Sequence, residues 1–157
     1  MPVDIVKYKY KHKRLVLKMY ESSSHCVFKL AVHLVFCTKY RRKLLSRQDI
    51  KTALEQEFNG IAAELGVEIV KSHIADTHVH LLVSYPPTLA ITEIVAKLKT
   101  YSSLNVRKRF PELKKSSSNQ NNRSALWSRG YFASSVGANT SKAVERYIAD
   151  HVNKIQD

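Results

Sequence analysis

The stretch that decides the fold is Ile-Ala-Asp-Thr-His-Val-His-Leu-Leu-Val-Ser, residues 74–84. Its second half is apolar and partly β-branched, which is typical of a buried strand. Because side chains alternate across a strand, His78 and His80 are expected to project side by side from one face. Two adjacent neutral imidazoles can bind a divalent metal ion. Two core histidines satisfied by hydrogen bonds would show the same spacing, so the pair alone leaves both interpretations open.

Segments of alternating helical and extended character surround this strand. A hydrophobic repeat of three and four residues predicts each helix, and short apolar runs bounded by turn residues predict the strands. Residues 76–77 form a tight turn that would join two antiparallel strands as a hairpin. In chain order we predict a strand at 26–38, a helix at 47–66, strands at 67–75 and 78–84, a helix at 91–110, a strand with its approach at 126–136, and a helix at 141–155.

This order of elements predicts a ferredoxin-like α+β fold of βαββαβ type. Such a fold has an antiparallel four-stranded sheet with two helices on one face, and here an extra C-terminal helix follows. The first and third strands are central in this topology. The strand that carries His78 and His80 would therefore lie in the middle of the sheet.

Length and composition are those of one ordinary globular domain. The chain has 157 residues, of which 44% are hydrophobic and 25% are charged. We assign residues 25–157 to one domain, with a polar mobile loop at 116–124, and residues 1–24 to a basic arm that either contacts nucleic acid or is a solvated tail. No apolar run is long enough to cross a bilayer, and two cysteines are too few for a disulfide scaffold, so we predict a cytoplasmic protein without a membrane partner.

The net charge of +13 is concentrated in two stretches. Residues 1–43 hold 11 basic and two acidic side chains, and residues 97–115 hold seven basic and one acidic. Such a distribution favours binding to a polyanion, most often nucleic acid, although a solvated charge run is the usual alternative. The candidate contacts are a cluster at the end of the first core strand and one face of the second helix: Lys39, Tyr40, Arg41, Arg42 and Lys43, then Lys97, Lys99, Arg107, Lys108 and Arg109.

The last predicted helix adds two reactive side chains. Tyr147 and His151 stand four residues apart and so share one helical face. Three histidines and a tyrosine could carry out metal-assisted attack of a phenol oxygen on a phosphodiester. An unaided phenol, with a pKa near ~10, is a weak nucleophile at neutral pH. Tyr147 could instead be a core residue, as a tyrosine on an apolar helical stripe usually is.

Blocks along the whole domain resemble the HUH-type single-tyrosine transposases of insertion sequences that transpose as single-stranded DNA. The resemblance extends roughly over residues 24–156. It is carried by these residues in order: His33-Leu-Val-Phe-Cys-Thr-Lys-Tyr-Arg-Arg-Lys43, His78-Val-His-Leu-Leu-Val-Ser84 with Pro86-Pro87, Ile94-Val-Ala-Lys-Leu-Lys99 with Ser102-Ser103, Phe110-Pro111, Leu126-Trp-Ser128, Tyr131-Phe132, Ser135-Val-Gly137 and Tyr147-Ile148.

The resemblance implies a role for each matching residue. His78 and His80 would bind a divalent metal ion, Mg²⁺ or Mn²⁺, and Tyr147 would form a 5′-phosphotyrosine and release a 3′-hydroxyl. His151 holds the place of a third ligand that is often glutamine in the family. The basic clusters would contact single-stranded DNA hairpins at the transposon ends. The family also implies a homodimer, in which Gly137 could act as a hinge for exchanging the tyrosine helix between subunits.

Besides His151 in place of glutamine, a second departure from the family pattern and two alternative functions accompany this interpretation. The family often has an acidic residue directly before the first histidine, where this chain has Thr77. A non-catalytic module that binds single-stranded nucleic acid on a ferredoxin-like sheet would not form a covalent adduct. A metal-dependent hydrolase would cleave DNA through activated water, also without an adduct.

Overall fold

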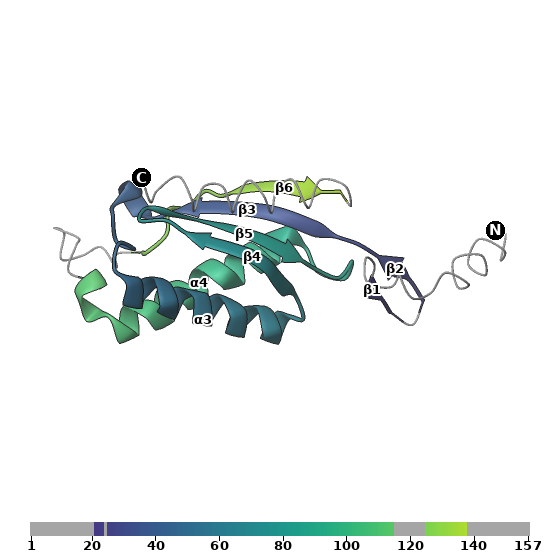
Figure 1. Ribbon diagram of the computed structural model, residues 1–157, viewed down its shortest axis with the longest axis horizontal. Helices are drawn as coiled ribbons and strands as arrows, with labels where there is room; N and C mark the ends of the chain where they lie inside the picture. The colour runs from purple at the N-terminus through teal and green to yellow at the C-terminus, as the bar shows by residue number, and fades with distance from the viewer. Residues whose placement is uncertain (1–20, 24, 115–124, 138–157) are drawn as a thin grey trace.

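The structure is a computed structural model that describes residues 21–23, 25–114 and 125–137. Within these residues a four-stranded sheet lies over a layer of two α-helices (Figure 1). In chain order the elements are β1 (Glu21–Ser22), β2 (Val27–Phe28), β3 (Ala31–Cys37), the 3-10 helix η1 (Lys39–Arg41), α3 (Gln48–Leu65), β4 (Glu68–Ile74), β5 (His78–Ser84), α4 (Ile91–Arg109), the 3-10 helix η2 (Pro111–Lys114) and β6 (Phe132–Val136).

The sheet has the strand order β4-β5-β3-β6, and all neighbouring strands are antiparallel. This order confirms the predicted ferredoxin-like fold, in which the first and third strands are central. The predicted hairpin is also confirmed, because β4 pairs with β5 across a turn closed by a hydrogen bond from the Ala75 N–H to the His78 carbonyl. The two histidines therefore lie on a central strand with neighbours on both sides.

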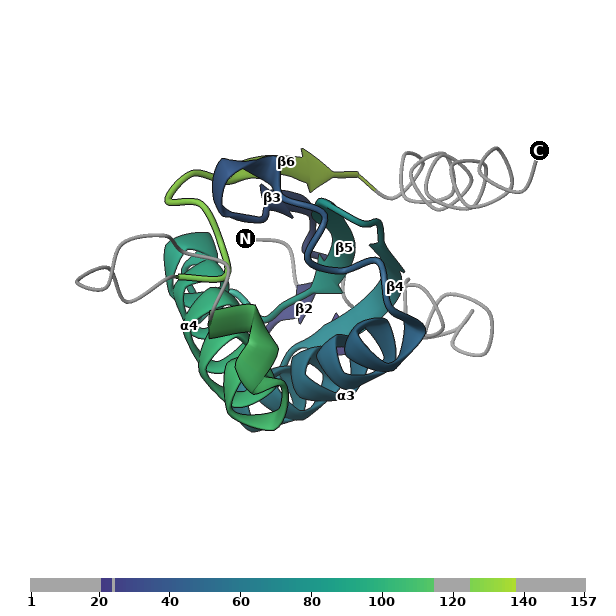
Figure 2. The ribbon, with the colours of Figure 1, turned by 90° about the vertical axis from the view of Figure 1, so that its left-hand side faces the viewer.

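Both α-helices pack against one face of this sheet, side by side (Figure 2). α3 places Ile50, Leu54 and Phe58 in the core, at the helical spacing of three and four residues. It ends at Gly66, whose φ of 69° lies in the left-handed region that glycine adopts without steric cost. The predicted helices at 47–66 and 91–110 agree with α3 and α4 to within two residues.

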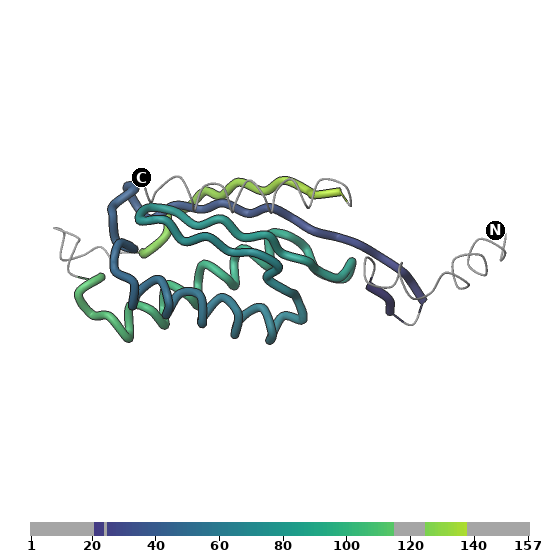
Figure 3. The backbone as a smooth tube through the Cα atoms, in the orientation of Figure 1, coloured from purple at the N-terminus to yellow at the C-terminus, as the bar shows by residue number. Residues whose placement is uncertain are grey.

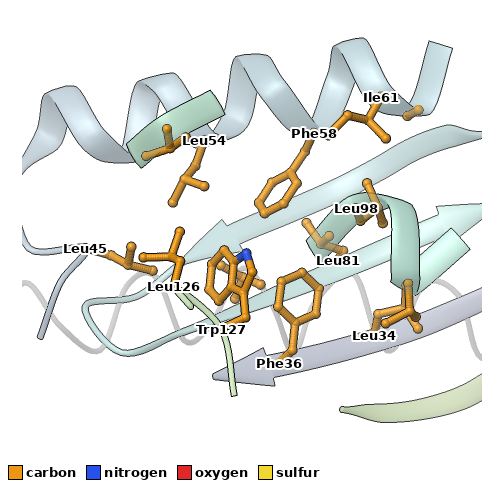
Figure 4. Close-up of a cluster of buried hydrophobic side chains, with 14 of the residues drawn as sticks. Leu34, Phe36, Leu45, Leu54, Phe58, Ile61, Leu81, Leu98, Leu126 and Trp127 are labelled. Atoms are coloured by element: carbon orange, nitrogen blue, oxygen red, sulfur yellow. The ribbon is translucent and has the colours of Figure 1, made fainter. Parts of the chain in front are cut away.

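The core lies between the helices and alternate residues of the central strands (Figure 4). Phe36 meets Trp127 edge to face with ring centres 4.8 Å apart, and Phe58 approaches both rings. The indole N–H of Trp127 donates to the Ser102 hydroxyl over 2.9 Å, which satisfies two buried polar groups together. The helix-facing residues of the central strands are Val32, Leu34, Phe36, Val79, Leu81 and Val83.

One predicted strand boundary was wrong. The strand predicted at 26–38 is two elements, because Val27–Phe28 pairs with Glu21–Ser22 in a separate two-stranded hairpin that extends beyond the sheet (Figure 3). That hairpin also places Glu21 in a strand, where we predicted the basic arm to continue to residue 24. In the segment predicted as a strand with its approach at 126–136, the strand begins at Phe132. Leu126 and Trp127, in the approach, enter the core, and Trp127 forms a single bridge with Thr38, the residue after β3.

Candidate active site

Four histidines gather on the sheet face opposite α3 and α4, which we call the histidine face and define by His33, His73, His78 and His80. Cross-strand partners share a face, and the register pairs His73 with His80. His33 lies diagonally across from His80, because it pairs with Leu82. All four side chains are half-buried. The sheet thus brings together histidines from three strands.

The predicted pair has the geometry of two ligands to one ion. The ring centres of His78 and His80 lie 5.1 Å apart, and the rings are inclined at 72°. Two imidazoles that bind one tetrahedral ion through nitrogens ~2.1 Å from it have ring centres roughly 5 Å apart. Two neutral nitrogen donors also suit a divalent transition metal. The two side chains therefore fit a shared metal ion.

Each ring of the pair has a hydrogen-bonding partner at its Nδ1 atom. The Thr77 hydroxyl lies 3.0 Å from His78 Nδ1, and His33 Nε2 lies 3.1 Å from His80 Nδ1. The His33 and His80 rings are also stacked, with centres 5.3 Å apart and planes inclined at 18°. Thr77, at the position where the resemblance suggests an acidic residue, is therefore within hydrogen-bonding distance of the adjacent histidine.

Burial lowers the pKa of His33 below its usual value, because the imidazolium loses solvation. Its ring is consequently neutral at pH 7 and can accept a hydrogen bond through one nitrogen. The edge of the Phe132 ring, on the neighbouring strand β6, lies next to His33 with ring centres 6.0 Å apart. This contact adds to the stacking against His80 in restraining the His33 ring.

The basic cluster after β3 forms a left-handed turn close to this pair. Tyr40 and Arg41 have φ values of 59° and 51°, which residues other than glycine rarely adopt. The turn is held by Thr38, whose N–H donates to the Thr77 carbonyl over 2.8 Å and whose hydroxyl donates to the Arg42 carbonyl over 2.7 Å. Because Thr77 adjoins His78, the cluster begins beside the histidine pair.

The turn exposes an aromatic ring between two cations. Tyr40 is 71% exposed, with Lys39 Nζ and Arg42 Cζ 5.4 and 5.3 Å from its ring centre. A ring and cations in this arrangement can stack on a base and contact the flanking phosphates. Strained backbone of this kind is found mostly at functional sites.

The basic residues of α4 are not equivalent. Lys97, Lys108 and Arg109 are exposed, whereas Arg107 is half-buried and donates to the Ser103 carbonyl. The ammonium group of Lys99 donates to three successive carbonyls, those of Ser128, Arg129 and Gly130, over 2.7–3.1 Å.

The pKa of Lys99 is lowered by burial, which removes solvent from the ammonium group. All three of its donors point at protein carbonyls. The geometry therefore favours a role in holding the segment before β6 over the predicted phosphate contact.

The sequence comparison decides the family. Residues 26–151 match the family described as "Transposase IS200 like". The chain is an IS200-like transposase. The ISDra2 transposase TnpA of Deinococcus radiodurans is 32% identical over 128 residues, which are 82% of this chain and 88% of that protein. The transposase for insertion sequence element IS200 of Salmonella typhimurium is 29% identical over 128 residues, 82% of this chain and 80% of that protein.

Solved structures agree with this assignment. The crystal structure of a candidate transposase from Deinococcus radiodurans superposes with a TM-score of 0.67 at 28% identity, covering 83% of this chain and 96% of that one. A REP-associated tyrosine transposase bound to a REP hairpin has a TM-score of 0.56 at 13% identity, covering 87% of this chain and 73% of that one. At that identity the second likeness concerns the fold alone.

Two predicted site residues of this IS200-like transposase, Tyr147 and His151, lie outside the described part of the chain, as does the predicted helix at 141–155 that carries them. The predicted arm before residue 21 and the predicted loop at 116–124 also lie outside it. Gly137 is described and directly follows β6. In the described ranges no group of three or more His, Cys, Asp or Glu side chains is placed to hold a metal ion. No described helix combines the length and apolarity of a membrane span.

Sequence reasoning assigned no role to His33 or His73, although the structure places both on the histidine face. His33 shares the inward–outward alternation of its strand, so its face was readable from the sequence. Its proximity to His80 depends on the register between β3 and β5, which local sequence patterns do not specify. His73 depends in the same way on the register between β4 and β5.

Proposed function

We propose that this IS200-like transposase cuts and rejoins single-stranded DNA at hairpin-marked transposon ends through a covalent 5′-phosphotyrosine on Tyr147. The observation that carries the proposal is the pair of His78 and His80 on the central strand β5, whose ring centres lie 5.1 Å apart. The family to which the chain belongs supports it. Both residues alternate along β5 with the buried Val79 and Leu81, so they lie on the sheet face opposite the two described α-helices, where a DNA strand and a further helix could approach.

The reaction exchanges one phosphodiester for another. The Tyr147 oxygen attacks the phosphorus, a phosphorus–oxygen bond to tyrosine forms, and the bond to the 3′-oxygen of the upstream strand breaks. The phenol proton is lost and the leaving oxygen gains a proton, which leaves a free 3′-hydroxyl. In the reverse direction a 3′-hydroxyl attacks the phosphotyrosine, restores a DNA phosphodiester and releases Tyr147. Both bonds are of one type, so the exchange needs no external energy source.

His78 and His80 would hold a divalent metal ion, with His151 as a third ligand. When bound, the ion would supply charge withdrawal from the phosphate oxygens and so favour attack by a weak nucleophile. The two described side chains contribute neutral imidazole nitrogens from one strand, which need no rearrangement to approach a common ion. Their central position in the sheet keeps their backbone fixed.

The DNA would be bound by the basic turn and by the exposed cations of α4. Lys39 to Lys43 begin next to Thr77 and His78, so a strand bound there leads to the histidine pair. Lys97, Lys108 and Arg109 lie on the helix layer at the other side of the sheet, with Arg107 half-buried among them. A structural neighbour of the same fold was solved with a hairpin. We propose that hairpins are recognised here too, by a homodimer in which Gly137 permits exchange of the tyrosine helix.

A labelled-DNA assay tests the mechanism. The full chain is incubated with single-stranded hairpin DNA labelled at either end and with Mn²⁺, then analysed on a denaturing protein gel. We expect a covalent band that carries the label 3′ of the cut, and its loss in Tyr147→Phe. Tyr101→Phe, on the exposed surface of α4, is the matched control and should form the adduct normally. Binding without an adduct would favour a binding module, and cleavage without an adduct would favour a hydrolase.

The ligand set predicts a metal preference. The proposed ligand set has three imidazoles, whereas two imidazoles and a glutamine amide are common in the family. Imidazole nitrogens favour later first-row ions over magnesium, which prefers oxygen ligands. We therefore expect Mn²⁺ to support adduct formation at lower concentration than Mg²⁺. In His151→Gln the two titration midpoints should move closer together. Equal midpoints in the unmodified protein would contradict the assigned ligand set.

A further inference from the structure

We propose that His33 and Thr77 are positioning residues that hold His80 and His78 so that both would coordinate a metal ion through Nε2. The inference rests on the proposed metal-binding role of the histidine pair. It concerns two residues that touch the candidate ligands and not the metal ion itself. The observations that carry it are two hydrogen-bonding contacts, each to an Nδ1 atom of one ligand ring.

His80 is oriented by a residue from another strand. A neutral imidazole has one N–H and one lone pair, so the partner of one nitrogen determines what the other can do. If His80 Nδ1–H donates to His33 Nε2, the proton of His33 sits on its own Nδ1, and the lone pair of His80 sits on Nε2. The 3.1 Å between the two nitrogens fits a hydrogen bond in either direction, and we assign this one because only this direction leaves the lone pair of His80 on Nε2. Coordination by His80 then falls to Nε2.

His78 is oriented by its sequence neighbour. The Thr77 hydroxyl oxygen lies 3.0 Å from His78 Nδ1 and can accept a hydrogen bond from the Nδ1–H group, which again leaves the lone pair on Nε2. Thr77 is itself fixed, because its carbonyl accepts from the N–H of buried Thr38 over 2.8 Å, with the Thr38 hydroxyl 3.1 Å away. The threonine is therefore a rigid support and not a loosely placed surface hydroxyl.

The two contacts together produce a symmetrical pair. Each ligand would present the same ring nitrogen, and each ring plane is fixed by a partner that does not reach the ion. Partners of this kind set the tautomer and the orientation of a metal-binding histidine, and their loss typically costs 10- to 100-fold in metal affinity. Two independent supports explain how the rings can be held at 5.1 Å before any ion binds.

Metal affinity is measured with Co²⁺ alone, by its visible absorption, in the full chain carrying Tyr147→Phe so that no DNA chemistry intervenes. We expect His33→Phe, which keeps a stacked ring without nitrogen, to weaken Co²⁺ binding about 10- to 100-fold. Thr77→Val should have an effect of the same order. His33→Gln and Thr77→Ser retain a hydrogen-bond acceptor and should restore much of the affinity. His25→Phe removes an exposed histidine beside the β1–β2 hairpin and should leave affinity unchanged.

Nitrogen chemical shifts of the metal-free protein supply the second readout. We expect His78 and His80 to be Nδ1–H tautomers. In His33→Phe, the His80 ring should become a mixture of the Nδ1–H and Nε2–H tautomers. An Nε2–H tautomer of His80 in the unmodified protein would overturn the assignment, and so would unchanged Co²⁺ affinity in folded His33→Phe and Thr77→Val. If His33→Phe fails to fold, the tautomers of the unmodified protein and the Thr77 variants decide the matter.

The outcome is separable from that of the proposed function. Failure of Tyr147 to form an adduct, with Co²⁺ binding and tautomers as expected, would refute the phosphotyrosine mechanism and leave the positioning roles standing. An adduct that forms normally, with Co²⁺ affinity insensitive to both residues, would refute the positioning roles alone.

Discussion

The two faces of the central strands β3 and β5 differ in chemistry, although both faces are formed by the same two strands. Alternate residues of each strand point to opposite faces. On the helix side, Leu34, Phe36 and Leu81 are almost completely buried. On the histidine face, His33, His78 and His80 are half-buried and contact one another or a hydroxyl. Alternation along two strands therefore separates the residues that stabilise the fold from those available for chemistry. Substitutions on the two faces should accordingly affect different measurements.

The largest effect is expected on the helix side. Phe58→Ala would leave a cavity beside the Phe36 and Trp127 rings, and we expect it to lower the free energy of unfolding by about 3–5 kcal/mol. Chemical denaturation measures this directly. Tyr40→Ala, which removes an exposed ring of similar size, is the control and should cost well under 1 kcal/mol. Similar losses in both variants would refute the location of the core.

On the histidine face, we expect a substitution to reduce activity strongly and to change stability little. His80→Ala should reduce covalent adduct formation more than about a hundredfold, since removal of a ligand exceeds the effect of removing its support. Its free energy of unfolding should change by only about 1 kcal/mol, because the ring is half-buried. Adduct kinetics and denaturation of one preparation give both numbers. A collapse of stability with residual activity would show that the histidines belong to the core.

Lys99 is a charged residue for which we expect a role in the stability of the fold and not in DNA binding. Lys99→Met keeps the aliphatic stem but deprives three carbonyls of their donor, and we expect a loss of about 1–2 kcal/mol in the free energy of unfolding. Lys97→Met on the same helix removes an ammonium group whose contact within the described residues is an exposed pair with Glu93, and it should cost no more than about 0.5 kcal/mol. If DNA affinity falls more in Lys99→Met than in Lys97→Met, without loss of stability, the phosphate contact is the correct assignment.

The smallest effect concerns the ion pair that links the helix layer to the turn before the histidines. A hydrogen bond from Lys51 lowers the pKa of Asp76, and burial opposes it. Because the folded pKa is the lower one, the stabilisation is present above the unfolded pKa near ~4 and is lost as pH falls through the folded value.

Asp76 is 47% exposed, so solvent screening limits this contribution to about 0.5 kcal/mol or less. Between pH 5 and pH 2, Lys51→Met should therefore lose slightly less stability than the unmodified protein. Lys108→Met, on the exposed side of α4, should match the unmodified protein. An acid dependence that Lys51→Met leaves unaltered would mean that the pair contributes nothing in solution.

Local patterns predicted the elements well where one periodicity dominated. The apolar spacing of α3 and the glycine after it specify a helix and its end independently of the rest of the chain. The strand boundaries were less accurate, because Val27 and Leu126 are apolar but serve other contacts: Val27 joins a small separate hairpin and Leu126 fills the core beside Trp127. Hydrophobicity alone does not say which partner a short apolar run will find.

The sequence by itself determined that His78 and His80 share a face, since a strand has a period of two and both rings lie on the same strand. It also determined the order of elements, from which the central position of that strand follows. Only the tertiary structure decided that His33 reaches His80, that Thr77 is held by Thr38, and that Lys99 is engaged by carbonyls. These contacts join residues up to 47 positions apart, and they depend on strand register and helix packing, which short-range patterns do not encode.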